Sequence, residues 1–138
     1  MTTKHDEIAS LQRRVMEAID RQDWPAVKDL TAPRLRVHVG GPDMDFDGWL
    51  AQGKMFYSAF PDGKHELQEV VVENDRAAVR GVWRGTHTGT FNGIPATGRK
   101  VAIDLAMIDR FVDGRLVDHW GIFDALGLLQ QIGAIPTP

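Results

Sequence analysis

The sequence predicts an α+β fold, in which a curved antiparallel sheet wraps around three N-terminal helices and leaves an interior pocket. Apolar residues recur at helical spacing through the first ~60 positions, and strand-like alternation then replaces that period for most of the remaining chain. A short helical segment closes the sequence. Since the chain has 138 residues and 43% hydrophobic side chains, we expect one domain, residues 1–138, with one core.

Three helices are predicted in the first half, over residues 6–22, 23–30 and 48–59. In the first of them apolar residues stand three and four positions apart, which indicates one buried face. Pro25 fits the first turn of the second helix, because a proline there loses no hydrogen bond. The third helix carries an apolar stripe that we expect to face the pocket: Trp49, Gly53, Phe56 and Phe60.

Five strands are predicted. The first is short, covers residues 35–39 and carries His38. The others cover residues 65–73, 76–89, 99–111 and 115–122, and a loop rich in glycine and proline occupies residues 91–98. The terminal helix is expected over residues 124–132. Asp124 stands at its start, where a carboxylate accepts backbone N–H groups as an N-cap.

The turn at Asp113-Gly114 decides which side chains of the last hairpin face inward. A two-residue turn would place Ile108 opposite His119, whereas a three-residue loop with a bulge at Gly114 would place Met107 there. Alternation favours the bulged loop, because it turns an unbroken apolar set inward: Ile103, Leu105 and Met107. The inner face of the last strand is then predicted to be Val117, His119, Gly121 and Phe123, with Trp120 pointing outward.

The same alternation predicts the inner face of the strand at 76–89 as Val79, Gly81, Trp83, Gly85 and His87. Glycines beside Trp83 are expected to leave room for a cavity. The predicted lining is apolar and aromatic, with His87 and His119 as its main polar groups, and Asp124 is the nearest candidate to orient His119. The predicted substrate-binding residues are His38, Trp49, Phe56, Phe60, Trp83, Met107 and Gly121.

Composition excludes several classes of site. The chain has no cysteine, which removes disulfides, thiolate nucleophiles and cysteine-ligated metals. The five histidines form no helical metal-binding pair, so we expect no metal, and no glycine-rich loop joins a strand to a helix as a phosphate cradle requires. The net charge of -3 gives no reason to expect nucleic acid as a partner. Because no apolar run has membrane-spanning length and the N-terminus lacks a signal-peptide core, we expect a cytoplasmic protein.

Two segments carry a resemblance to a known family: RGTHTGTFNGIPATGRKV at 84–101 and DRFVDGRLVDHWGIFDALGLLQQIGAIP at 109–136. They resemble SnoaL-like polyketide cyclases, also called predicted ester cyclases, of the nuclear transport factor 2-like superfamily. The resemblance implies an α+β cone and cofactor-free closure of a polyketide ring by intramolecular aldol condensation. It also implies a homodimer or higher homo-oligomer that associates through the outer face of the sheet.

The family's functional positions carry over only in part. His119 matches the last-strand histidine and His87 matches the histidine of GTHTG, but the position of the acid/base aspartate is Gly121 here. A second pocket histidine of the cyclases corresponds to Met107, and Asp124 matches an aspartate common in the family. The predicted catalytic set is therefore His119, His87 and Asp124.

The predicted function is that of a cofactor-free cyclase or isomerase acting on a hydrophobic, oxygenated polyketide-like molecule. His119 would exchange the proton, and His87 would stabilise the enolate charge. The alternative is a non-catalytic ligand-binding or scaffold member of the same fold, because Gly121 stands where the family has its carboxylate. Water addition or epoxide opening would need carboxylates around a water, and the predicted inner face offers none apart from Asp124.

Overall fold

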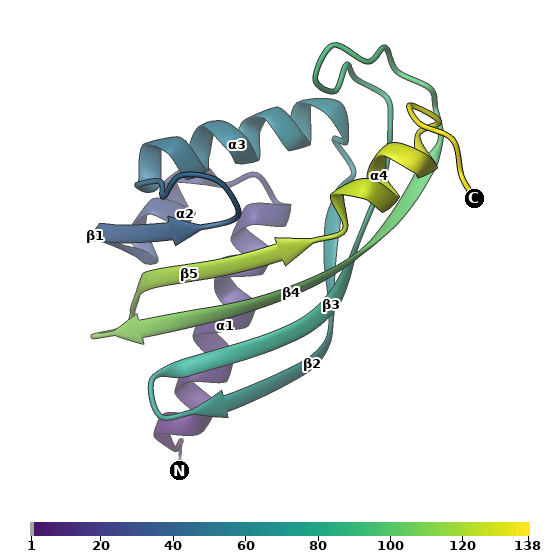
Figure 1. The fold of residues 1–138 in the computed structure, drawn as a ribbon. Coiled ribbons are helices and arrows are strands. Elements are labelled where there is room, and N and C mark those ends of the chain that lie inside the picture. The colour runs from purple at the N-terminus through teal and green to yellow at the C-terminus, as the bar shows by residue number, and fades with distance from the viewer. Residues whose placement is uncertain (1) are drawn as a thin grey trace.

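The computed structural model describes residues 2–138, and Figure 1 colours the chain from purple to yellow in sequence order. Three helices and one strand come first: α1 (Lys4–Asp20), α2 (Trp24–Asp29), β1 (Thr31–His38) and α3 (Phe46–Ala59). Four strands and a last helix follow: β2 (Lys64–Glu73), β3 (Arg76–Thr86), β4 (Lys100–Val112), β5 (Arg115–Phe123) and α4 (Ala125–Gln131). The predicted order of elements is confirmed.

The strands form one five-stranded sheet in the order β1-β5-β4-β3-β2. Neighbours from β2 to β5 are antiparallel, as predicted, whereas β1 pairs with β5 in parallel. The sheet is curved, with α1 and α3 on its concave side (Figure 1). This is the predicted α+β cone, with β1 making the sheet mixed at one edge.

Local sequence explains where the helices that cover the sheet begin. α1 starts with a capping box, since Thr3 and Asp6 each accept the other's backbone N–H. Its apolar face is buried, as the spacing predicts, through Ile8, Leu11, Val15 and Ile19. α3 begins at Phe46 rather than Gly48, because Asp45 caps it by accepting the Gly48 N–H.

The hairpin of β4 and β5 has a register that differs from both predicted ones. Its turn contains only Asp113 and Gly114, both with positive φ, and Val112 pairs with Arg115. The extra residue lies inside β5, where Phe111 pairs with Leu116 and Arg110 pairs with Asp118, so Val117 is bulged. The predicted bulge at Gly114 is therefore wrong in position. The predicted inward direction of His119 is nevertheless right. One extra residue reverses which side chains of β5 face inward, whether it lies in the loop at Gly114 or at Val117.

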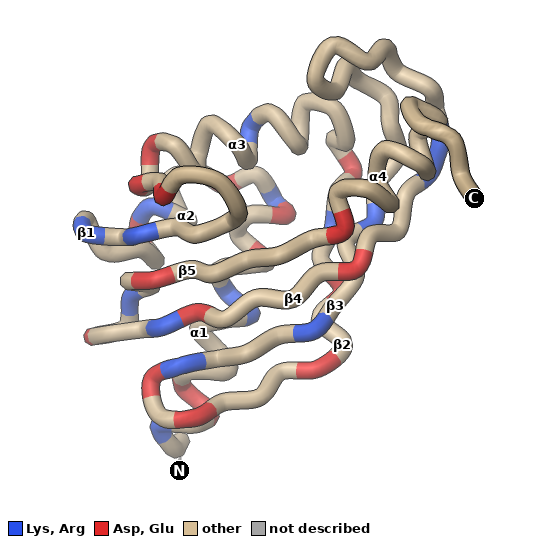
Figure 2. Tube along the Cα trace, in the orientation of Figure 1, with Lys and Arg blue, Asp and Glu red and all other residues tan. Residues whose placement is uncertain are grey.

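The outer face of the sheet combines charged pairs with an apolar strip. Figure 2 shows basic and acidic positions interspersed over the strands, and ion pairs such as Arg84–Glu66 and Arg110–Asp118 cross between them. The apolar strip consists of exposed large side chains on three strands: Val71, Ile108, Trp120 and Ile122. Trp120 points outward, as predicted. Among the described residues, no helix is both long and apolar enough to cross a membrane.

Candidate functional site

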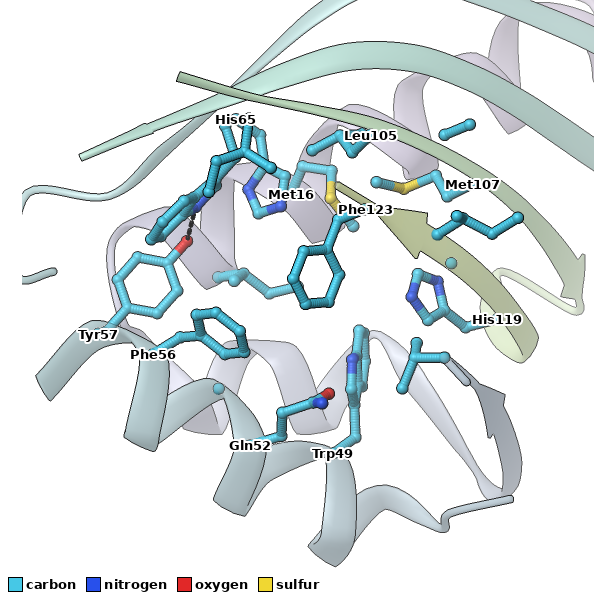
Figure 3. Close-up of a pocket in the computed structure, with 18 residues that line it drawn as sticks. Met16, Trp49, Gln52, Phe56, Tyr57, His65, Leu105, Met107, His119 and Phe123 are labelled. Carbon is cyan, nitrogen blue, oxygen red and sulfur yellow. Dashed lines mark hydrogen bonds between the residues drawn. The ribbon is translucent and has the colours of Figure 1, made fainter. Parts of the chain in front are cut away.

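An apolar cavity of about 150 Å³ lies between the concave face of the sheet and helices α1 and α3 (Figure 3). A space of this size can hold a benzene-sized ring. Strands β3, β4 and β5 supply one wall, and α3 supplies the opposite wall. Six of the predicted catalytic and substrate-binding residues line it: Trp49, Phe56, Trp83, Met107, His119 and Gly121.

His119 occupies one end of this cavity and is held by a buried carboxylate. Its Nδ1 lies 2.5 Å from Oδ1 of Asp109, its cross-strand partner on β4. Asp109 is 0% exposed and His119 is 5% exposed. Because an ionised carboxylate only accepts, this hydrogen bond places a proton on Nδ1, and in the neutral imidazole Nε2 keeps its lone pair. Nε2 hydrogen-bonds to no described residue, and it lies beside Gly121 on the cavity wall.

Asp109 is the residue that corrects the expected site. Asp124 does not orient His119: it is exposed and caps α4 by accepting the Gly127 N–H, 2.8 Å away. We also expected no carboxylate other than Asp124 on the inner face of the sheet, and the buried Asp109 shows that this expectation is wrong. The alternation of β4 contained the signal for Asp109. Asp109 lies two positions after Met107 in the inward-facing series, and the next member of that series, Phe111, is buried as well.

Helix α3 places two hydrogen-bond donors on the wall opposite the sheet. The Trp49 ring lies against His119, with ring centroids 5.0 Å apart. Gln52 follows one turn later, and Figure 3 shows its amide beside Trp49, turned toward the cavity. Gln52 was not predicted, although it lies on the same helical stripe as Trp49 and Phe56.

The other end of the cavity carries a second, unpredicted polar cluster. Oδ1 of Asp20 accepts from the Tyr57 hydroxyl at 2.6 Å and from His65 Nδ1 at 2.7 Å. The Tyr57 oxygen accepts in turn from Nε1 of Trp83 at 3.3 Å. Burial first, and then the negative charge and hydrogen bond of Asp20, raise the pKa of Tyr57 far above its usual value, so the phenol stays protonated. Tyr57 and His65 both line the cavity.

The family model for SnoaL-like polyketide cyclases matches residues 9–132. The chain belongs to the SnoaL-like polyketide cyclase family. A curated relative, the aklanonic acid methyl ester cyclase DnrD of Streptomyces peucetius, is 37% identical over 83 residues, which cover 58% of this chain and 57% of the relative. The chain thus spans a little over half the length of that relative.

Solved structures extend the similarity over the whole fold. AclR from Streptomyces galilaeus, a candidate hydroxylase, superposes with a TM-score of 0.91 at 27% identity, over 98% of this chain and 86% of AclR. IdmH from Streptomyces antibioticus, a candidate polyketide cyclase, superposes with a TM-score of 0.84 at 32% identity, over 91% of this chain and 98% of IdmH. The SnoaL-like fold predicted from the two sequence segments is confirmed.

Gly121 keeps the free nitrogen of His119 open in this SnoaL-like chain. A Cβ at position 121 would lie 3.0 Å from His119 Nε2 and 3.2 Å from Cγ1 of Val39. Any side chain there would crowd the nitrogen that faces the cavity. The glycine at position 121 therefore leaves direct access to the imidazole from the cavity.

His87 and Phe60 do not line the cavity, contrary to the prediction. The two rings pack on each other, both 0% exposed, with centroids 5.3 Å apart. His87 Nδ1 accepts from the Thr97 backbone N–H and lies 2.9 Å from the Thr97 hydroxyl. The glycines of β3 explain this outcome, because neighbouring segments of the chain pack into the space beside them and leave no cavity there. A Cβ at Gly85 would lie 3.1 Å from Cβ of Phe60, and one at Gly81 would lie 2.5 Å from the Glu66 carbonyl oxygen.

His38 also lies outside the cavity. Its ring stacks on Trp120 at the edge of the sheet, with centroids 4.8 Å apart, and Nδ1 lies 2.7 Å from Oδ1 of Asp43. The prediction of a pocket role for His38 is therefore wrong. β1 ends at His38, and the side chain turns toward the outer surface with its parallel partner Trp120. No cluster of histidine and carboxylate side chains suited to a metal ion occurs within residues 2–138.

Proposed function

We propose that this SnoaL-like chain is a cyclase that closes a ring by acid/base chemistry at His119 without a cofactor. The observation that carries the proposal is the environment of His119. Nδ1 is tied to the buried carboxylate of Asp109, and Nε2 is free on the wall of an apolar cavity. A histidine held in this way can act as a general base, because one nitrogen is fixed as a donor and the other accepts a proton.

The proposed reaction begins with loss of a proton from the carbon next to a substrate carbonyl to His119 Nε2. Asp109 stabilises the imidazolium, and the enolate oxygen accepts a hydrogen bond from the opposite wall, where Gln52 and Trp49 lie. The enolate carbon then bonds to a second carbonyl carbon of the same molecule. Nε2 returns the proton to the new alkoxide, so the product is an isomer and no electrons leave the substrate.

The proposed substrate is a hydrophobic, oxygenated, polyketide-like molecule. Most of the cavity lining is aliphatic or aromatic, which suits a flat molecule with few polar groups. The space holds one ring, so a larger substrate would extend past Phe123 and Ile122, which are 36% and 77% exposed. The similarity to DnrD makes aklanonic acid methyl ester the first compound to test.

The test is to incubate the purified chain with that ester, without any added cofactor, and to separate substrate from isomeric product by chromatography. We expect turnover in the parent and a loss of about 10²- to 10⁴-fold in His119→Gln, the usual contribution of a general base. His38→Gln is the matched control, because His38 lies outside the cavity. Equal turnover in parent and His119→Gln would refute the assignment.

A second candidate function, ligand binding without turnover, is motivated by Gly121, because the family resemblance implies an acid/base aspartate at this position. Binding of the ester with no isomerisation would support it. Gly121→Asp then separates the two candidates, although its Cβ must displace the His119 ring slightly. New turnover in the variant, absent from the parent, favours the binding function, whereas loss of existing turnover favours the cyclase.

We also propose that two copies associate through the apolar strip on the outer face of the sheet. Ile108 and Trp120 are 47% and 38% exposed, and they lie with Ile122 around a shallow hollow. An exposed apolar area of this kind is typical of a subunit contact. We expect a dimeric mass by light scattering at micromolar concentration and a monomeric mass for Ile122→Lys. A parent that is monomeric at every concentration would contradict this proposal.

A further inference from the structure

The polar cluster at the far end of the cavity is separate from the pair of His119 and Asp109. It joins the last residue of α1, Asp20, to Tyr57 on α3 and His65 on β2. The side chains of Asp20 and His65 are both only 15% exposed. Figure 3 shows Tyr57 and His65 at one end, His119 at the other, and the ring of Phe123 between them.

The geometry of this cluster assigns donors and acceptors to its side chains. Tyr57 donates its hydroxyl proton to Asp20, and it remains protonated because burial and Asp20 raise its pKa. Asp20 also accepts from the His65 backbone N–H at 2.9 Å and from His65 Nδ1. Nδ1 therefore carries the imidazole proton, and Nε2 of a neutral His65 is an acceptor. No described residue hydrogen-bonds to that nitrogen, although His65 lines the cavity.

The position of Asp20 is unfavourable for the helix that supplies it. Carboxylates destabilise the C-terminal end of a helix, where the backbone carbonyls already concentrate negative charge, and the last turn of α1 contains no basic residue. Three hydrogen bonds to Asp20 offset this, and all three come from Tyr57 and His65. A residue placed against local preference and held by such a network is typical of a functional site.

We propose that His65 is a recognition site for an aromatic hydroxyl group of the ligand. The lone pair on Nε2 takes an O–H donor, and the surrounding rings of Trp83 and Phe56 suit a flat ring bearing that hydroxyl. Asp20 and Tyr57 act as positioning residues, since they fix the tautomer and direction of the imidazole. The inference deepens the proposed function by naming a substrate group at the end opposite His119, and it rests on the same cavity.

The test measures binding of three small probes by ¹⁹F NMR: 4-fluorophenol, 4-fluoroanisole and fluorobenzene. Only the phenol can donate a hydrogen bond. We expect it to bind roughly three- to tenfold more tightly than the other two, the range that one neutral hydrogen bond supplies. His65→Phe should abolish that preference while keeping an aromatic ring at the position. His38→Phe is the matched control, because His38 lies outside the cavity, and it should retain the preference. His119→Phe tests the other free imidazole nitrogen of the cavity and should leave the preference at His65 in place.

Two results would overturn the proposal: equal binding of all three probes by the parent, or a phenol preference lost in His119→Phe and kept in His65→Phe. If His65→Phe does not fold, the parent labelled with ¹⁵N-histidine gives the answer. The Nε2 resonance of His65 should then move with 4-fluorophenol and stay in place with 4-fluoroanisole, and an unmoved resonance refutes the site. Because binding is measured without turnover, failure of this inference is distinct from failure of the proposed cyclisation.

Discussion

Replacing Asp109 by asparagine is the most direct probe of the proposed chemistry. The change keeps the side-chain volume at a position that is 0% exposed and removes the charge that faces His119 Nδ1. A hydrogen bond to a charged group contributes about 1.5–3 kcal/mol, so losing it at the imidazolium stage lowers kcat about 10- to 150-fold. If the new amide instead donates to Nδ1, the proton moves to Nε2 and the base is lost, with a fall of up to about 10⁴-fold.

The stability of Asp109→Asn should change much less than its activity. A carboxylate without access to water is costly to bury, and Oδ2 of Asp109 has no hydrogen-bond partner among the described residues. The stability gained by removing this buried charge therefore offsets part of the stability lost with the hydrogen bond. We expect the free energy of unfolding in urea to change by no more than about 2 kcal/mol.

The assay compares kcat and KM for ester cyclisation with urea unfolding curves of the same preparations. Asp104→Asn is the matched control, since Asp104 lies on the same strand but is exposed. We expect a lower kcat with little change in KM for Asp109→Asn only. A parental kcat in a fully folded Asp109→Asn would contradict the proposed role of Asp109. A fall in kcat that only follows the unfolded fraction would mean that Asp109 acts on stability alone.

Three further predictions concern other parts of the fold. Gly121→Ala should lower turnover at least about tenfold with unchanged folding, because its Cβ would lie 3.0 Å from His119 Nε2; parental turnover in the variant would contradict this. Tyr57 is the sole tyrosine, and its pKa is raised, so absorbance of the folded chain should show no phenolate near pH 10, where the denatured chain titrates. Since the unfolded state then loses its proton first, Tyr57 makes stability fall as pH rises above about 10, and Tyr57→Phe should remove that part of the slope. Phenolate forming near pH 10 in the folded chain would show that Tyr57 is not held as described. Phe60→Ala should destabilise the chain by about 3–5 kcal/mol in urea unfolding, because the ring is 0% exposed; a loss below about 1 kcal/mol would mean that the packing with His87 and Trp83 contributes little.

Patterns of short range predicted much of the fold and part of the site. Alternation along single strands placed His119 inward and Trp120 outward, and both directions hold in the structure. Helical spacing identified the buried face of α1 and the side of α3 that carries Trp49 and Phe56. These inferences succeed because neighbouring side chains along one strand or helix alternate with the local backbone period.

The same rule failed wherever a neighbouring segment decided the outcome. His87 has inward parity, yet it is enclosed, because Gly85 admits the end of α3 against β3 and Phe60 fills the space. Likewise, the bulge at Val117 rather than Gly114 depends on how two strands pair, and that pairing makes Asp109 the partner of His119.

The fold class, the family and the inward direction of His119 could be predicted before any coordinates, because period, turn residues and two motif-bearing segments are properties of consecutive positions. The surroundings of the cavity could not, since they depend on tertiary packing. The pairs Asp20–Tyr57 and Asp20–His65 span 37 and 45 positions of the chain. No period links residues that far apart, because their contact depends on how α1, α3 and β2 pack together. The chemistry proposed for both ends of the cavity thus depends on packing that brings carboxylates from elsewhere in the chain against two histidines.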